Sequence, residues 1–253
     1  MRLPMLALVA GLLITLTACQ QGETNTVFGA RVRAYLLEHP EVLQEAMTRL
    51  QERQTQQQQQ AARAALPRLR AALERDPRDF VANPNGRITV TEFYDYRCGH
   101  CISIAPHILE LIQQNPDVRF VFKEMPIFGE ASDRAAHVAI AVRRSGGDSL
   151  GLYRTFMLTR GLDDAGVARI ALANGVTPAA LADPAFMRSA LAQLADSQAI
   201  ANQLGITGTP SFVVGDEIIV GEDREALARA IASQRRGVTS PGRPPVPAAP
   251  TSR

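Results

Sequence analysis

The stretch ITVTEFYDYRCGHCISIAPHILELI, residues 88–112, decides how the chain folds. Its first part, 88–96, is rich in β-branched and aromatic residues and predicts a strand. Its last part, 102–112, repeats isoleucine and leucine at helical spacing. Cys98 and Cys101 are therefore expected where a strand passes into the first turn of a helix.

A cysteine at the start of a helix is easier to ionise than a free one. Unpaired backbone N–H groups and the positive end of the helix dipole both favour a thiolate. We expect Cys98 to be the exposed, attacking sulfur, and Cys101 to be buried and to resolve the mixed disulfide. His100 is either a solvated surface histidine or, beside the nucleophile, a group that stabilises the thiolate. Gly99 leaves room for a substrate chain.

The same four residues could also form half of a zinc site or a structural disulfide. A structural zinc needs four ligands, but the only other cysteine is Cys19. His39, His107 and His137 show no ligand spacing, and a structural bridge does not call for a helix N-terminus. The pattern therefore favours a redox dithiol, with no resident metal and no cofactor.

A second motif, GTPSFVV at 208–214, adds a proline before a short apolar strand. Together the two motifs resemble the thioredoxin superfamily, most closely its DsbA-like branch. The resemblance implies that Pro210 is a cis-proline facing the C-x-x-C motif, and that the Thr209 backbone pairs with substrate. It also implies that Glu92, six residues before Cys98, is a buried acid that handles protons; the alternative is an outward-facing surface acid. Pro106 matches a kinking proline in the active-site helix.

The resemblance implies an α/β thioredoxin fold with an inserted helical domain and an N-terminal helical arm. The thioredoxin domain is expected over 86–236, with the insertion at about 130–204. The arm is expected over 27–85. Residues 237–253 are rich in proline, glycine and serine and predict a disordered tail.

Composition and the N-terminus limit the possible locations. The chain has 253 residues and a net charge of +2, which gives no case for nucleic acid as a partner. Residues 1–18 have the pattern of a lipoprotein signal peptide, with Cys19 as the lipidated residue. The alternative is an ordinary signal peptide with Cys19 incidental. We expect 19–26 to be a tether, and a lipid-anchored protein in the cell envelope that faces the periplasm, with the outer membrane favoured.

The arm carries an amphipathic stripe that it cannot bury on itself, formed by Val42, Leu43, Ala46, Met47 and Leu50. Either the stripe packs on the catalytic domain, or it packs on other copies and makes a homo-oligomer through residues 27–80. The arm resembles, more loosely, that of DsbA-like proteins of the copper-sensitivity-suppressor type, in which it can oligomerise the enzyme.

Two functions are open at this point. The first is a thiol–disulfide oxidoreductase that forms or isomerises disulfides in exported proteins with cysteines, served by an unidentified membrane redox partner. The second is a copper-handling or copper-tolerance protein that uses the same dithiol, since soft thiolates suit Cu(I).

Overall fold

The computed structural model describes residues 15–239, which divide into two compact units between Gln57 and Gln58. The first unit holds helix α1 (Thr15–Glu38) and the beginning of helix α2 (Pro40–Glu74). α1 runs through 19–26, so the segment expected to be a tether is helical. Of the expected signal peptide, 1–18, residues 1–14 lie outside the described residues, and of Cys19 only the backbone is described.

The helices of the first unit present apolar side chains to solvent. Phe28, Leu37 and Met47 are exposed to more than 60% of their surface. The stripe expected from the sequence is exposed apart from Val42, which is half-buried. Among residues 15–239, no helix has the length and apolar character that a membrane crossing requires.

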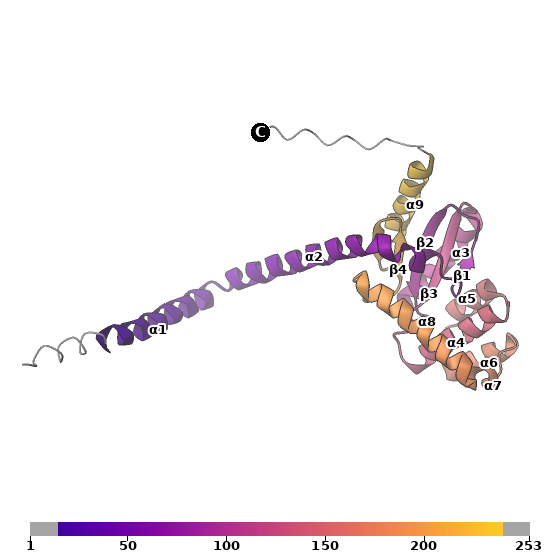
Figure 1. Cartoon of the computed structure of the whole chain (residues 1–253), viewed down its shortest axis with the longest axis horizontal. Helices are drawn as coiled ribbons and strands as arrows, with labels where there is room; N and C mark the ends of the chain where they lie inside the picture. The colour runs from indigo at the N-terminus through magenta and orange to yellow at the C-terminus, as the bar shows by residue number, and fades with distance from the viewer. Residues whose placement is uncertain (1–14, 240–253) are drawn as a thin grey trace, which may run out of the picture. The chain divides into compact units, whose positions relative to one another are not determined.

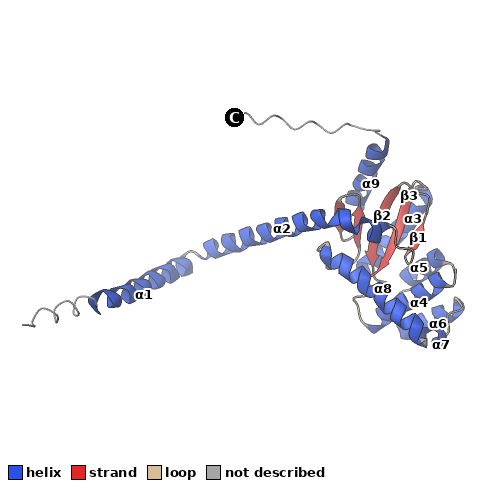
Figure 2. Cartoon of the chain, in the orientation of Figure 1, coloured by secondary structure: helices blue, strands red, loops and turns tan. Residues whose placement is uncertain are grey.

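The second unit is a five-stranded sheet with helices on both faces (Figures 1 and 2). After α2 its elements are β1 (Phe80–Ala82), β2 (Ile88–Tyr94), α3 (Gly99–Gln114), β3 (Val118–Glu124), α4 (Glu130–Arg144), α5 (Ser149–Leu158), α6 (Asp164–Ala173), α7 (Pro178–Ala182), α8 (Pro184–Gln203), β4 (Ser211–Val214), β5 (Glu217–Val220) and α9 (Arg224–Thr239). This arrangement agrees with the DsbA-like thioredoxin fold that the family resemblance implies, and α4–α8 lie where the helical insertion was expected.

The strand order is β1-β3-β2-β4-β5, so β2 lies at the centre. β2 pairs in parallel with β3 and antiparallel with β4, and β5 pairs antiparallel with β4. The register of β2 and β3 places Glu92 opposite Phe122 and Tyr94 opposite Glu124. The active-site segment therefore leaves the sheet from its central strand.

Each face of the sheet has its own apolar core. One face packs against α3, α4, α5, α6 and α9, with Ile104, Ile108 and Phe156 fully buried. The other face packs against the end of α2 and the end of α8. Leu66 and Leu73 of α2 are completely buried there. Burying each such side chain stabilises the fold by roughly 1.5–3 kcal/mol. The end of α2 is therefore part of the second unit, residues 58–239, which is called the catalytic unit below.

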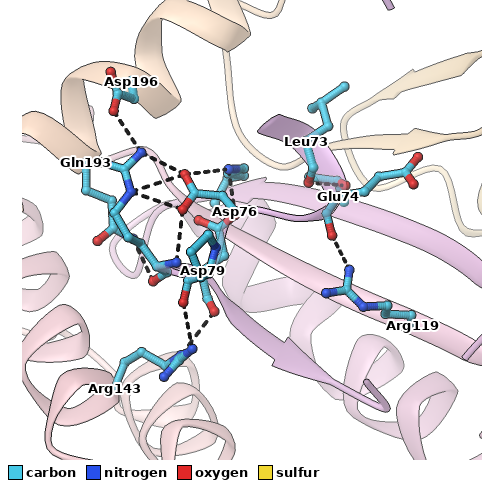
Figure 3. A network of polar contacts seen from close by, with 12 residues as sticks. Leu73, Glu74, Asp76, Asp79, Arg119, Arg143, Gln193 and Asp196 are labelled. Carbon is cyan, nitrogen blue, oxygen red and sulfur yellow. Dashed lines mark hydrogen bonds and ion pairs between the residues drawn. The ribbon is translucent and has the colours of Figure 1, made fainter. Parts of the chain in front are cut away.

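A polar network fastens the segment between α2 and β1 to the rest of this unit (Figure 3). Arg143 of α4 donates to the backbone oxygens of Asp79 and Pro77 at 3.0 and 2.8 Å. Lys123 of β3 lies 2.5 Å from the Asp79 carboxylate, and both side chains are 1% exposed. Arg119 donates to the backbone oxygen of Glu74. These contacts join α2, β1, β3 and α4.

The boundary of the arm therefore differs from the expectation of 27–85. Residues 58–82 belong to the catalytic unit, and they include the edge strand β1. α2 continues through Pro67, a residue that usually interrupts a helix. The preceding Leu66 is fully buried, and packing outweighs the local penalty of a proline. Residues 237–239 extend α9, and the rest of the expected tail lies outside the described residues.

Candidate active site

Cys98 lies at the N-cap of α3, directly after the loop that leaves β2. Its backbone oxygen accepts the first helical hydrogen bond, from Ile102 at 3.0 Å, and its N–H donates to Asp95. Cys98 and Cys101 are free thiols in the structure. Cys98 was expected to be the exposed sulfur, but it is only 2% exposed. Its neighbours Arg97, Gly99 and His100 are exposed, so the site opens to solvent around it.

The two thiols have opposite electrostatic environments. A hydrogen bond from Cys101 is the largest effect that lowers the pKa of Cys98, and Thr209 and the backbone N–H groups of Cys101 and His100 add to it. Together they outweigh burial and lower that pKa to about 5. Burial raises the pKa of Cys101 far above its usual value, and the bond to Cys98 and the charge of Glu92 add to this. Cys98 is thus the thiolate of the pair, and Cys101 holds the proton.

The turn before β4 closes over Cys98. The Thr209–Pro210 peptide bond is cis, as the family resemblance implies. The Cys98 thiol donates to the backbone oxygen of Thr209 at 3.1 Å. The hydroxyl oxygen of Thr209 is buried, and within the described part of the chain it has no hydrogen-bond partner. It is therefore available to donate to a Cys98 thiolate.

Glu92 lies on β2 with its side chain buried, 1% exposed. The Tyr153 hydroxyl is 3.4 and 3.5 Å from its two carboxylate oxygens. Burial raises the pKa of Glu92 to about 8, although the Tyr153 hydroxyl acts in the opposite direction. A carboxyl group with this pKa, whose charge acts on Cys101, can give and take a proton near neutral pH.

His100 and Gly99 lie at the open side of the site. The His100 ring is 73% exposed, and its Nδ1 is 3.2 Å from Glu222. Its contribution to the Cys98 thiolate comes from its backbone N–H. A Cβ built on Gly99 would meet no atom within 4 Å. The fold itself therefore does not require glycine at this position.

Asp95 shapes the loop around the nucleophile, a role that the sequence alone does not indicate. Its buried carboxylate accepts from the N–H groups of Arg97 and Ile127, both at 2.7 Å. It also accepts from the hydroxyl of Ser132 at 2.8 Å. Asp95 thus holds the segment before Cys98 against the loop after β3, where Ile127 and Phe128 are exposed.

A cluster of buried tyrosines lies beside Glu92 and was not expected from the sequence. Tyr94 and Tyr96 both donate to Glu124 at the end of β3. Glu92 and Tyr94 alternate on β2, a spacing that places their side chains on one face of the strand, and Tyr96 follows two residues later in the loop. That signal was present in the sequence, but the position of Glu124 depends on how β2 pairs with β3. Residues 15–239 contain no group of three or more His, Cys, Asp or Glu side chains suited to a metal ion.

Comparison with known families explains this arrangement. A model described as the DSBA-like thioredoxin domain matches residues 89–232, which is more than half of the chain. The chain belongs to the DSBA-like thioredoxin family. It is thus a thiol–disulfide oxidoreductase in the general sense of that family. A second model, the copper resistance protein ScsC N-terminal domain, matches residues 26–62.

Solved structures of this family align with most of the chain. A thioredoxin-like oxidoreductase from Silicibacter pomeroyi is 37% identical to this chain, with a TM-score of 0.60. The alignment covers 66% of this chain and 98% of that protein. BcfH of Salmonella enterica Typhimurium is 32% identical (TM-score 0.60; coverage 86% and 98%). ScsC of Proteus mirabilis, in a transitional conformation, is 28% identical (TM-score 0.63; coverage 87% and 99%). The comparison with curated proteins gave no match.

Proposed function

We propose that this protein forms and isomerises disulfide bonds in exported proteins through Cys98 and Cys101. The observation that carries the proposal is the contrast between the two sulfurs. Cys98 has a pKa of about 5 at the N-terminus of α3, and the pKa of Cys101 is strongly raised. A sulfur that is stable as a thiolate is a good leaving group, and its disulfide is readily reduced.

In the oxidising direction, a substrate thiolate attacks Sγ of Cys98 and forms a mixed disulfide. The Cys98–Cys101 bond breaks, and its electron pair goes to Sγ of Cys101, which takes the proton of Glu92. A second substrate thiolate then attacks the substrate sulfur of the mixed disulfide and releases Cys98 as a thiolate. The substrate has lost two electrons and gained a disulfide. An unidentified membrane redox partner would reoxidise the dithiol.

In the isomerising direction, the Cys98 thiolate attacks an incorrect bridge in the substrate. The Thr209 backbone before Pro210, which lies beside Cys98, offers a place where a substrate segment can pair. His100 at the rim and the open space at Gly99 leave room for that segment. We assign Thr209, Pro210 and Gly99 to substrate binding on these grounds.

The exposed apolar side chains of the first unit support a homo-oligomer through the arm. Exposed apolar faces commonly mark interfaces, and the match of 26–62 to the ScsC N-terminal domain is consistent with an oligomerisation arm. Several sites in one assembly would raise the effective concentration of Cys98 around a bound substrate, which favours isomerisation.

Refolding assays and light scattering test the proposal together. We compare residues 20–253 with residues 58–253, a version that keeps all of the α2 residues packed on the catalytic unit. Reduced ribonuclease measures oxidation, and scrambled ribonuclease measures isomerisation. We expect the longer protein to be an oligomer active in both assays, and the shorter one to be a monomer that keeps only oxidation.

A matched variant, Leu43→Glu with Met47→Glu, keeps the full arm but places charge on its exposed face. It should behave like the shorter protein. Monomeric masses for the longer protein, the shorter protein and the variant alike would exclude the oligomer. They would also remove the reason to expect isomerisation.

The pattern at 1–19 supports export and a lipid anchor at Cys19. In cells, Cys19→Ala should release the protein from membranes or block its processing. Unchanged membrane association of the mature variant would exclude the anchor.

Copper handling is a second candidate, because the model that matches 26–62 is that of a copper resistance protein. Cu(I) would be a cargo held by the thiolates of Cys98 and Cys101, since soft ligands suit this ion. Titration of the reduced protein against a chromophoric Cu(I) chelator distinguishes the two functions. Loss of copper from the chelator in the wild type, but not in Cys98→Ser, would support the copper function.

A further inference from the structure

The short loop between β5 and α9, residues 221–223, lies against two parts of the active site. The backbone N–H of Gly221 donates to the backbone oxygen of Pro210 at 2.8 Å, in the turn before β4. Oε1 of Glu222 is 3.2 Å from Nδ1 of His100, the third residue of the C-x-x-C motif. The loop therefore reaches the cis-proline turn and the redox motif at once, and the exchange steps above do not use it.

Glu222 is a carboxylate that is held at the first turn of α3. A hydrogen bond from the Ser103 hydroxyl is the largest effect that lowers the pKa of Glu222, and the His100 ring adds to it. The charge of Arg224 acts in the same direction. Arg224 also donates to the backbone oxygen of Ser103 at 3.3 Å, which fixes the start of α9 on α3. Glu222 is thus anchored on α3 independently of its contact with His100.

The imidazole of His100 faces Glu222 and not the nucleophile. Among the side chains of the described residues, its only polar partner is the Glu222 carboxylate. The contribution of His100 to the Cys98 thiolate comes from its backbone N–H instead. Because that N–H lies at the sulfur, the side chain of the same residue can turn toward the sulfur when nothing else holds it.

We propose that Glu222 is a positioning residue that holds the imidazole of His100 away from Sγ of Cys98, and so limits how strongly the dithiol oxidises its substrates. The inference rests on the proposed function, because it concerns the balance between forming substrate disulfides and keeping Cys98 reduced for isomerisation. Glu222 has no contact with the reacting sulfurs and acts only through His100.

The physical reason lies in the reduced state of the protein. When a substrate dithiol passes two electrons to the Cys98–Cys101 bond, Cys98 becomes a thiolate, and whatever stabilises that thiolate makes the disulfide a stronger oxidant. An imidazole ordinarily carries a proton near pH 5, where Cys98 ionises. Its positive charge beside the sulfur would stabilise the thiolate further. The contact with Glu222 withholds this charge, and the thiolate keeps only its other donors.

A surface ion pair without this role would behave differently. Exposed pairs often contribute little, and Glu222 would then act on Cys98 only through its own negative charge. Removing the carboxylate would have the same effect on the Cys98 thiolate whether or not the His100 side chain is present. If Glu222 acts by holding the imidazole, its effect disappears together with that side chain.

A double-mutant cycle between Glu222 and His100 separates the two cases. Glu222→Ala, His100→Ala and the double variant are made in residues 20–253, which contain only the two cysteines of the site. Glu225→Ala is the control, because this carboxylate is in the first turn of α9, is 89% exposed, and pairs with Arg229 of its own helix. Ultraviolet absorbance of the thiolate gives the pKa of Cys98, and equilibration with glutathione gives the oxidising strength of the dithiol.

We expect Glu222→Ala to lower the pKa of Cys98 and to shift the glutathione equilibrium toward the reduced protein by about threefold, the size of a typical exposed charge interaction. Glu225→Ala should change neither quantity. Adding Glu222→Ala to His100→Ala should also change neither. Glu222→Gln keeps an acceptor for the Ser103 hydroxyl, and it should shift both quantities in the same direction as Glu222→Ala.

Each outcome bears on one claim. An equal effect of Glu222→Ala with and without the His100 side chain would overturn this inference, and so would wild-type values in both Glu222 variants. Either result would leave the proposed function intact if the wild-type pKa of Cys98 is low. A wild-type pKa near the ordinary value of about 8.5 would instead overturn the proposed function, which depends on the contrast between the two sulfurs.

Discussion

The thiol of Cys98 donates a hydrogen bond to the backbone oxygen of Thr209, with 3.1 Å between sulfur and oxygen. This contact joins the start of α3 to the turn before β4, across 111 positions of sequence. A thiolate cannot make it, because ionisation removes the donated proton. The donors that remain are the Cys101 thiol, two backbone N–H groups and Thr209.

Thr209→Val tests the contribution of the threonine hydroxyl. Valine has the same shape but cannot donate to the thiolate, so the pKa of Cys98 should rise from about 5. Titration of the ultraviolet absorbance of the thiolate measures this directly. His100→Ala is the comparison, because it keeps the backbone N–H, and it should move the pKa less. A larger change for His100→Ala would assign the stabilisation to the imidazole instead.

The redox state should control how stability depends on pH. The pKa of Cys98 falls from about 9.0 to about 5 in the folded, reduced protein. The thiolate therefore stabilises the reduced fold fully above pH 9, and this contribution disappears as the pH falls to 5. The oxidised protein has no such thiol. Urea unfolding gives the free energy of unfolding of the reduced and of the oxidised form. The difference between these two free energies should shrink from pH 9 to pH 5, and a difference that is constant with pH would contradict the account.

Glu92→Gln should make the protein more stable and less active. The raised pKa of Glu92 means that its ionisation opposes folding, increasingly as the pH rises from about 4.5 to about 8. The substitution should raise the free energy of unfolding by about a few kcal/mol at pH 8, and by less at pH 5. Thermal unfolding at the two pH values checks this, and the rate of disulfide exchange should fall. Equal stability of both proteins at pH 8 would show that Glu92 is not buried as a neutral acid.

The sequence predicted the parts of the site that are set by local spacing. The positions of Cys98 and Cys101 follow from one strand and one helix, whereas the roles of Glu92 and Pro210 were implied by the family resemblance. Glu124 could not be predicted, because it reaches Tyr94 only through the register of two strands. The burial of Cys98 was missed for a similar reason, since it depends on the distant turn at Thr209. The arm boundary was misplaced because the contacts of Leu66 and Leu73 are long-range.

The buried ion pair of Lys123 and Asp79 should hold the segment between α2 and β1 against β3. Lys123→Met leaves the Asp79 carboxyl buried without its cation, which typically costs about 3–5 kcal/mol. Lys123→Met combined with Asp79→Asn removes both charges and should recover much of that loss. Chemical unfolding of the three proteins measures the difference. A double variant no more stable than Lys123→Met would show that packing, rather than the unpaired charge, causes the loss.

The central claim is that Cys98 attacks and Cys101 resolves, and trapping of mixed disulfides tests it most directly. Each cysteine is replaced by serine in turn, the protein is incubated with an unfolded substrate that carries cysteines, and covalent complexes are separated without reducing agent. The account predicts abundant complexes for Cys101→Ser, joined through Cys98, and none for Cys98→Ser. Abundant complexes for Cys98→Ser, or exchange activity retained in that variant, would contradict it.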